Sequence, residues 1–470
     1  MTVESNFSIE DSKYDDDGRI KRTGTCMTAS AHIVTAVIGS GVLSLAWAFA
    51  QLGWIAGSVV LVLFSIITYF TACLLCDCYR YPDPVHGTRN RTYIESVKSI
   101  LGGFQHKLCG LAQYINLVGC TIGYTLTASI SIVAIIKSNC FHKYGQEADC
   151  DTANYPYMII FGVFQIFLSQ IPDFHELSWL SIVAAVMSFG YASIGIGLSI
   201  AKIAEKGHHL ETGLTGVVVG VDVTSTKKMW NTFQALGNIA FAYCFSMVIV
   251  EIQESDDTLK SSPPEKKTMR KASLNAILIT TFFYALCGIL GYAAFGNSAP
   301  GNFLTGFGFY EPFWLVDIGN LFIIIHLVGA YQVFSQPVFS LVENWGSEKW
   351  PQNKMMTKEY SVGIPLVGIW RVNMFRLIWR TFYVIITTII AILLPFFNSV
   401  VGLIGALSFF PLTVYFPTEM YLTRLKVPKY SSMWIGMKLL SVFCFIVSLV
   451  AAVASIQGII SELAIYKPFG

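Results

Sequence analysis

Charged residues are scarce in this sequence, and several chemical signatures are missing. Asp, Glu, Lys and Arg make up 13% of the 470 residues, whereas hydrophobic residues make up 54%. A soluble domain is unable to bury that much apolar surface. The sequence has no G-x-G-x-x-G, P-loop or nucleophile elbow, so we expect no enzymatic activity. The net charge is only +2 and the basic residues form no stripe, which argues against a nucleic-acid partner.

Metal-ligand spacing is absent as well, so we expect no metal site and no bound cofactor. Five of the histidines stand apart in polar connections, namely His86, His106, His142, His208 and His209. The N-terminal stretch is polar and acidic, and it lacks the basic-then-apolar layout of a cleaved signal peptide. We expect residues 1–26 to form a disordered cytosolic tail.

Long apolar runs dominate the rest of the sequence. A helix needs about 20 apolar residues to cross a hydrocarbon core of about 30 Å. Eleven stretches meet this requirement, although the fourth is short, and they predict an all-α protein embedded in the lipid bilayer. The expected helices are 27–49, 52–76, 108–136, 155–170, 179–201, 231–252, 273–294, 313–342, 377–394, 400–422 and 433–459.

Lys and Arg residues gather in alternate connections, and cytoplasmic loops are normally the richer in them. The N-terminal stretch and the connections 80–107, 260–271, 349–376 and 424–429 hold most of these residues. This distribution predicts a cytosolic N-terminus, an extracellular loop at 203–230 and an extracellular tail at 460–470. The sequons that begin at Asn6 and Asn90 then lie inside, where no glycan is added.

Most of the 11 cysteines lie in or beside apolar stretches, where a small apolar role is usual. Cys140 and Cys150 differ because both lie on one short loop on the oxidising side, so we predict a disulfide between them. Cys73, Cys76 and Cys78 alternatively suggest a metal or palmitoyl site. Helix packing is the better interpretation, because no histidine or second cysteine pair lies nearby.

Two apolar stretches are interrupted near their middle by small residues. In the first, Gly39 and Gly41 flank Ser40. A break there would free backbone N–H groups and direct the positive end of a helix towards the membrane centre, which suits a carboxylate. The alternative is that these residues only let two helices pack closely. The sixth stretch has a similar interruption within 236–247.

Interrupted helices at matching positions of two halves predict an inverted repeat with a binding site at its interface. The two halves would be 27–202, with helices one to five, and 231–422, with helices six to ten. Helix 433–459 would follow as an eleventh.

Several long motifs resemble the plant amino acid permeases of the amino acid/auxin permease family. The resemblance extends from about Gly24 to Phe469. It implies eleven spans in a leucine-transporter-type 5+5 fold, symport of L-amino acids with protons as the coupling ion, and a plasma-membrane location. We expect the chain to act as a monomer. The motifs are AHIVTAVIGSGVLSLAWAFAQLGWIAG, SQIPDFHELSWLS, GYAAFGNSAPGNFLTGFGFYEPFWLVD, HLVGAYQVFSQP, FRLIWRTFYVIITT and LLPFFN with GLIGALSFFPLTVYFPTEMY.

The resemblance also implies roles for residues at the two interruptions. Backbone N–H groups of the first would bind the substrate carboxylate, and carbonyls of the second would receive its ammonium. The first set is Ile38, Gly39, Ser40 and Gly41, and the second is Ala240, Phe241 and Ala242. Phe241, Tyr243 and Phe245 are candidates for the side-chain pocket or its gate, and Tyr124 is a candidate for closing the site, although packing is the usual role of such aromatics.

The chain departs from the family pattern in two places. Many members carry an Asp where Asn238 stands, so the side-chain selectivity of this chain is in doubt, above all for cationic amino acids. The EIQDT motif that usually follows the sixth helix is replaced by a longer run that begins at Glu251. The additional residues lie in a cytosolic loop.

Ionisable residues at membrane depth indicate function, because they are costly there. His32, His326 and Asp317 are therefore the candidates for proton coupling, and an imidazole titrates in the pH range that such coupling requires. The alternatives are a structural histidine with satisfied nitrogens and a hydrated Asp317 near the outer end of its helix. Three further ionisable residues lie near inner helix ends, where they reach the interface or contribute to an inner gate, namely Glu251, Glu419 and Arg380.

Two other functions compete with the symporter hypothesis. One is a receptor that binds an amino acid and signals without net transport. The short termini, which carry no recognisable signalling domain, disfavour it. The other is an auxin carrier of the same family.

Overall fold

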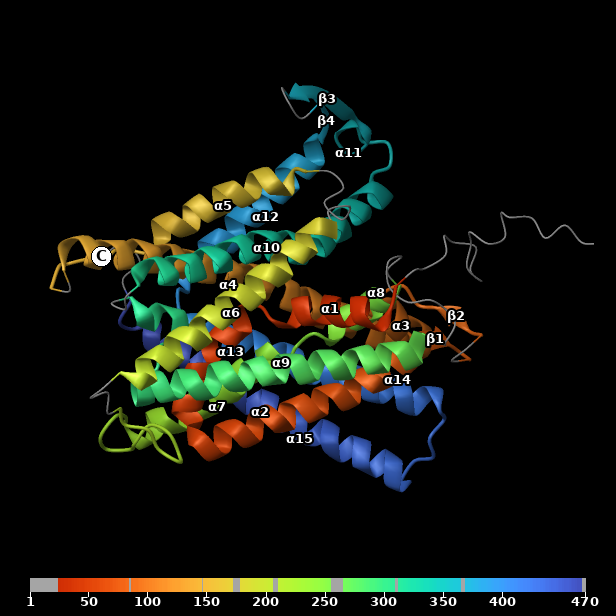
Figure 1. The fold of residues 1–470 in the computed structure, drawn as a ribbon. Helices are drawn as coiled ribbons and strands as arrows, with labels where there is room; N and C mark the ends of the chain where they lie inside the picture. The colour runs from red at the N-terminus through yellow and green to blue at the C-terminus, as the bar shows by residue number, and fades with distance from the viewer. Residues whose placement is uncertain are drawn as a thin grey trace, which may run out of the picture.

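The computed structural model describes residues 24–83, 86–145, 147–171, 178–205, 210–254, 265–308, 312–364 and 368–466. Most of the expected N-terminal tail lies outside these residues, as does much of the run that follows Gln253. Figure 1 shows a bundle of long helices that run roughly side by side.

Helices form most of the described chain. The α-helices are α1 (Cys26–Val37), α2 (Leu45–Asp77), α3 (Tyr93–Ile100), α4 (Gly103–Tyr144), α5 (Tyr155–Ser169), α6 (Ser178–Ala204), α7 (Ser225–Ala242), α8 (Ile249–Glu254), α9 (Glu265–Phe295), α10 (Phe313–Lys349), α11 (Lys354–Thr357), α12 (Met374–Leu393), α13 (Phe397–Ser408), α14 (Phe416–Arg424) and α15 (Ser432–Leu463). Shorter helical segments are η2 (Ser40–Ser44), η4 (Ser246–Val248), η5 (Gly296–Ser298), η6 (Phe303–Phe307) and the π-helical η7 (Phe409–Tyr415).

Nine helical stretches of the described residues are long and apolar enough to cross a membrane, and two shorter apolar helices accompany them. The sequence predicted eleven crossings, and these nine helices as they stand do not reproduce that count. The nine are Ser40–Asp77, Gly103–Tyr144, Val183–Ala204, Ser225–Glu254, Glu265–Ser298, Phe313–Lys349, Met374–Leu393, Phe397–Arg424 and Ser432–Leu463, and the shorter two are Cys26–Val37 and Tyr155–Ser169.

Large apolar side chains cover the outside of the bundle. Val59 and Ile66 of α2 are 60% and 59% exposed, and Leu439 and Val442 of α15 are 64% and 55% exposed. Runs of such residues on long helices are suited to contact with lipid tails. The structure therefore supports the prediction of a multi-pass membrane protein.

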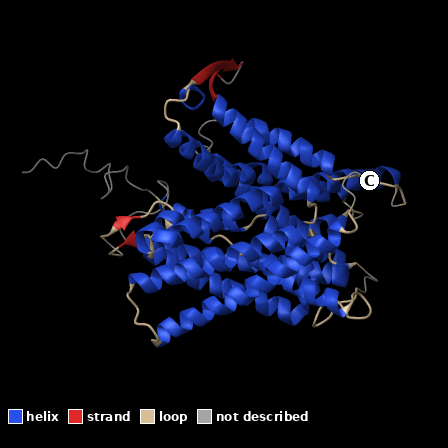
Figure 2. Ribbon diagram, turned by 180° about the vertical axis from the view of Figure 1, so that it is seen from behind, coloured by secondary structure: helices blue, strands red, loops and turns tan. Residues whose placement is uncertain are grey.

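Two small antiparallel hairpins depart from the expected all-α fold (Figure 2). Strand β1 (Arg80–Tyr81) pairs with β2 (Thr88–Arg89), and β3 (Glu359–Ile364) pairs with β4 (Gly368–Asn373). Both hairpins fall in connections rich in Lys and Arg, where the apolar periodicity used to find helices gives no signal.

The long helix α2 is kinked near its start by Gly53. This residue has φ 78°, a left-handed conformation that favours glycine. The connection that precedes α7 docks against the kink, since Val217 N–H donates to Ala50 O at 2.9 Å. A Cβ at Gly53 would lie 2.2 Å from Gly216 N, so no larger residue fits. The kink divides the stretch Ser40–Asp77 into two helical parts.

Helix α7 packs against α13 with their main chains in contact. A Cβ at Gly405 of α13 would lie 2.1 Å from Gly237 O and 2.6 Å from Phe241 N of α7. Glycine permits this approach because it has no side chain, as at many helix contacts in membranes. Helices α2, α13 and α15 all pack on α7, which places it in the interior of the bundle.

Candidate functional site

The first helix is broken at the position where Gly39 and Gly41 predicted an interruption. Helix α1 ends at Val37, Ile38 and Gly39 have non-helical backbone angles, and η2 begins at Ser40. The first N–H groups of a helix have no acceptor within it, so those of Ser40 and Gly41 are available to a ligand. Ser40 and Gly41 are buried.

The second break lies after α7, within the predicted interruption of the sixth helix. Helix α7 ends at Ala242, and the helix resumes only with η4 and then α8. The carbonyls of Ala240 and Phe241 accept main-chain N–H groups from Tyr243 and Cys244 at 3.2 and 3.1 Å. The last carbonyls of α7 therefore mark the negative end of this helix.

The two breaks meet in the centre of the bundle. A Cβ at Gly41 would lie 2.9 Å from Ala242 Cα and 3.2 Å from Phe241 Cδ1. The buried Tyr284 of α9 joins them, because its hydroxyl lies 2.6 Å from Val37 O and 3.0 Å from Ala242 O. A backbone N–H region and a backbone carbonyl region are thus brought side by side.

His326 lies against the first break. Its Nδ1 is 3.3 Å from Ala184 O and 3.1 Å from Ser188 Oγ, both on α6. Since a carbonyl only accepts, Nδ1 carries the hydrogen and Nε2 is the unprotonated nitrogen in the neutral ring. Nε2 would lie 3.7 Å from a Cβ at Gly39. Tyr191 of α6 donates its hydroxyl to Gly39 O at 3.0 Å.

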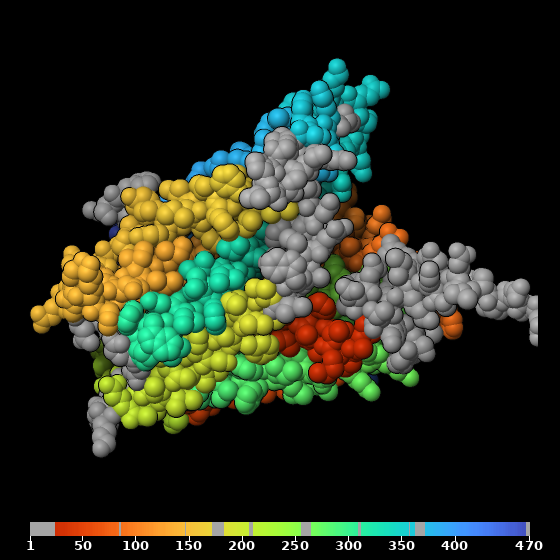
Figure 3. Space-filling model, turned by 45° about the horizontal axis from the view of Figure 1, so that its top comes forward, coloured from red at the N-terminus to blue at the C-terminus, as the bar shows by residue number. Residues whose placement is uncertain are grey.

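The other two candidates for proton coupling lie elsewhere. His32 is half-buried on α1, which reaches the surface beside α9 (Figure 3). Asp317 is close to the start of α10 and accepts a hydrogen bond from Asn139 Nδ2 at 2.7 Å. Nine residues along one helix span about 13 Å, so Asp317 is distant from His326 and from the break.

Three of the candidate aromatic residues lie at the second break, and the fourth, Tyr124, lies on α4. Tyr243 is buried, stacks edge-on against Tyr284 and shares a hydrogen bond with Thr281 at 2.9 Å. Phe241 faces Gly41. Phe245 is buried just after the break, and Tyr124 packs edge-on against Phe334 of α10.

Asn238, the candidate for side-chain selectivity, faces α13. Its Nδ2 donates to Asn398 Oδ1 at 3.3 Å, and its side chain lies against Gly402. The residue is fully buried. The structure therefore places this amide between α7 and α13. Gly402 of α13 also lies against Ser455 of α15.

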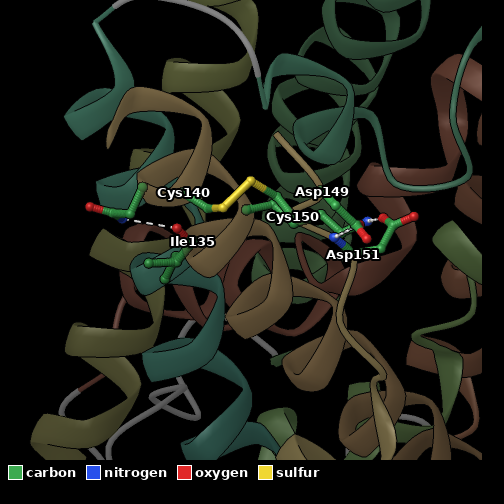
Figure 4. The surroundings of a disulfide bond; sticks show 7 residues. Ile135, Cys140, Asp149, Cys150 and Asp151 are labelled. Atoms are coloured by element: carbon green, nitrogen blue, oxygen red, sulfur yellow. Dashed lines mark hydrogen bonds and ion pairs between the residues drawn. A yellow bond between two sulfur atoms is a disulfide. The ribbon is translucent and has the colours of Figure 1, made fainter. Parts of the chain in front are cut away.

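A disulfide joins Cys140 near the end of α4 to Cys150 in the following connection (Figure 4). Beside it, Lys137 Nζ lies 2.5 Å from Asp151 Oδ1, and this hydrogen bond lowers the pKa of the Asp151 carboxyl. The disulfide and the ion pair both connect the end of α4 to the segment that leads into α5.

Arg380 and Glu419 do not simply reach solvent. Arg380 is buried, and it pairs with Glu343 at 2.7 Å and donates to Ser169 O at 2.7 Å, which links α5, α10 and α12. Glu419 pairs with Lys438 of α15.

The sequence did not reveal Glu343, Tyr191 and Tyr284 as functional candidates, because none of them lies in a motif or at an interruption. In the described part of the chain, no group of three His, Cys, Asp or Glu residues is arranged to hold a metal ion.

The chain is similar to known sequences along its whole length. The profile of the family described as transmembrane amino acid transporter protein matches residues 22–461. Amino acid permease 6 and amino acid permease 1 of Arabidopsis thaliana are 62% and 61% identical to it, and in both cases 100% of this chain aligns with 98% and 96% of theirs. Lysine histidine transporter-like 6 of the same plant is 30% identical, over 93% of this chain and 91% of its own.

The architecture is similar to that in the crystal structure of MhsT in complex with L-phenylalanine. The TM-score is 0.57 at 11% sequence identity, over 93% of this chain and 100% of MhsT. The likeness shows a shared fold, of the leucine-transporter type that the sequence resemblance implied. With its sequence matched from end to end, this chain belongs to the transmembrane amino acid transporter family.

Proposed function

We propose that the chain is a proton-coupled amino acid symporter that works by alternating access. The observation that carries this proposal is the meeting of two broken helices in the buried centre of the bundle. One break presents N–H groups and the other presents carbonyls, which complement the carboxylate and the ammonium of an amino acid. The permeases to which the chain is similar support the same substrate class.

In this proposal, the backbone binds what all amino acids share. The free N–H groups of Ser40 and Gly41 bind the carboxylate. Those of Ile38 and Gly39 join them only when they give up the hydrogen bonds that they donate to Val34 O and Val37 O, at 2.8 and 2.9 Å. The carbonyls of Ala240 to Ala242 bind the ammonium, since a carbonyl that already accepts one hydrogen bond keeps a second lone pair. Phe241, Tyr243, Phe245 and Tyr124 would then contact the side chain, which allows a broad range of substrates.

Eleven crossings and a 5+5 repeat are part of the proposal. Gly53 divides Ser40–Asp77, so α1 together with the part before the kink makes one interrupted crossing, and the part after it makes the second. Helix α5 adds the short fourth crossing. The breaks at Gly39 and Tyr243 then fall in the first and sixth crossings, which head the two repeats.

His326 is our first candidate for coupling, because its Nε2 faces the broken helix and its Nδ1 is held by α6. Proton uptake at Nε2 would place a positive charge beside the substrate site, and loss of that proton would remove the charge. Coupling of this kind makes substrate binding depend on the proton. His32 and Asp317 are also candidates, because they are ionisable residues at membrane depth. They rank second, because neither contacts the first break.

We further propose that the chain acts as a monomer in the plasma membrane, with the N-terminus in the cytosol and the C-terminus outside. The distribution of Lys and Arg supports this orientation. The disulfide near the expected outer face is consistent with it.

A substrate panel under voltage clamp, with external pH and sodium varied, tests the proposal. We expect inward currents evoked by amino acids that increase as the external pH falls. A receptor would bind amino acids without current or accumulation, and an auxin carrier would respond to indole acetate. Currents that follow sodium and ignore pH would contradict proton coupling.

A further inference from the structure

A buried carboxyl group lies just beyond the second break. Glu251 belongs to α8, six residues after Phe245. Its Oε1 accepts the N–H of Tyr93, the first residue of α3, at 3.1 Å. Its Oε2 is enclosed and finds no partner among the described residues. The neighbouring Gln253 is fully buried, and both polar atoms of its side chain are likewise unpartnered there.

No cation compensates Glu251 in the described part of the chain. Asp77 pairs with Arg270, while Arg80 and Arg89 both pair with Glu265. Lys98 of α3 is exposed. The buried thiol of Cys109 on α4 also lies near the carboxyl. The ionisable side chains on the helices packed against α8 are Cys26 and His32 of α1, Tyr69, Cys73, Cys76 and Asp77 of α2, and Tyr93, Glu95 and Lys98 of α3.

An enclosed carboxylate without a cation is strongly disfavoured, and such a group holds a proton instead. The N-terminus of α3 offers one N–H and a partial positive charge, which compensates only a small part of that cost. Glu251 is therefore expected to be protonated while α8 lies against α3. Once α8 separates from α3, water reaches the carboxyl and the ionised form becomes favourable.

We propose that the Glu251 carboxyl binds a proton while α8 is closed against α3 and releases it on the cytosolic side when α8 moves away. The inference rests on the proposed proton-coupled transport, and it adds a release group to the candidates at the first break. Helix α8 continues the broken α7, so its movement is directly connected to the substrate site. The released proton leaves to cytosolic water. The carboxylate takes up the next proton from external water by way of the substrate site while that site is open to the outside, so each cycle moves one proton inward.

Two assays on purified full-length protein in liposomes test this inference. The first measures accumulation of a labelled amino acid driven by a pH gradient. The second measures exchange of labelled for unlabelled amino acid without a gradient. The probe is whichever amino acid of the panel the unmodified chain accumulates best. Glu251→Gln resembles the protonated form, so we expect exchange within twofold of the unmodified chain and at least a tenfold loss of accumulation.

Glu254→Gln is the matched control on the same helix, and its side chain accepts a hydrogen bond from Tyr79 at 2.5 Å. We expect it to accumulate substrate normally. Glu251→Asp keeps a carboxyl and should accumulate with an altered dependence on internal pH, which guards against a folding defect in the Gln variant.

Each remaining outcome has a definite meaning. Normal accumulation by Glu251→Gln overturns the inference and leaves the proposed function intact. Loss of exchange together with accumulation, in both the Gln and Asp variants, also overturns it, because the residue would then be structural. Unmodified protein that ignores the pH gradient contradicts the proposed function itself.

Discussion

The two glycines of the first break have different surroundings. Gly41 packs against the backbone of Ala242, where a Cβ would approach to 2.9 Å. Gly39 has space, since the nearest atom to its Cβ would be His326 Nε2 at 3.7 Å. Its φ of −122° is also outside the left-handed region that favours glycine.

We predict that Gly41→Val abolishes transport whereas Gly39→Ala keeps much of it. A branched side chain at Gly41 would push the two breaks apart and cover the N–H groups. The expected loss is at least about tenfold, which corresponds to ~1.4 kcal/mol. Uptake is measured against the amount of protein at the cell surface. Normal uptake by surface-delivered Gly41→Val would show that these N–H groups do not bind the carboxylate.

A second prediction concerns the histidines. His326→Gln keeps a polar group able to bond α6 but loses the titrating nitrogen near Gly39, so its current should lose its dependence on external pH. His32→Gln is the comparison, because His32 is half-buried away from that contact. Substrate-evoked current against external pH, together with the charge moved per substrate, decides the matter. If both variants retain the behaviour of the unmodified chain, the coupling group lies elsewhere.

At the scale of the helices, the breaks were predictable and their contacts were not. Gly39 and Gly41 interrupt an apolar run, and that is a local signal. The hydroxyls of Tyr191 and Tyr284 reach the break from α6 and α9, far along the chain, so only the folded arrangement brings them there. The same reason explains why Arg380 was expected to reach the interface, whereas the structure pairs it with Glu343.

Helix boundaries were likewise predictable only in part from the sequence. The end of the first predicted helix at 49 is close to the kink at Gly53, but the sequence did not reveal that the outer connection docks there. The hairpin of β3 and β4 was also missed, because its strands are short and lie in a polar connection.

The contact of α7 with α13 leads to a third prediction. Gly405→Ala places a methyl group 2.1 Å from Gly237 O, so the two main chains must separate. Overpacking of this kind costs about 1–3 kcal/mol or more. We expect a lower melting temperature in detergent and poor surface delivery.

Gly197→Ala on α6 is the control for this substitution. Nothing lies within 4 Å of a Cβ at Gly197. In a helix interior, alanine is also more stable than glycine by about 0.5–1 kcal/mol. The control should therefore melt at the same temperature or slightly higher, and equal melting of both variants would contradict a tight contact at Gly405.

At the scale of the whole molecule, the fourth prediction is its orientation. An epitope tag at the C-terminus should be detected on intact cells, and one at the N-terminus only after permeabilisation. Asn90 should carry no glycan, since it lies inside in this orientation. Its side-chain Nδ2 also donates hydrogen bonds to Cys78 O and Tyr79 O, both at 3.2 Å. A glycan on Asn90, or an N-terminal tag accessible from outside, would reverse the assignment.

The hydroxyl of Tyr284 has a consequence for how the bundle rearranges. It has a single proton, yet Val37 O and Ala242 O both lie within reach. The hydrogen bond can therefore pass from one carbonyl to the other when α1 shifts relative to α7, with no net loss of bonds. Partner exchange of this kind leaves two arrangements close in energy. When the proton is directed to Val37 O, Ala242 O is free to accept a cationic group, whereas Val37 O accepts the Gly39 N–H at 2.9 Å in either case. A bound ammonium would therefore favour the arrangement in which Tyr284 donates to Val37 O.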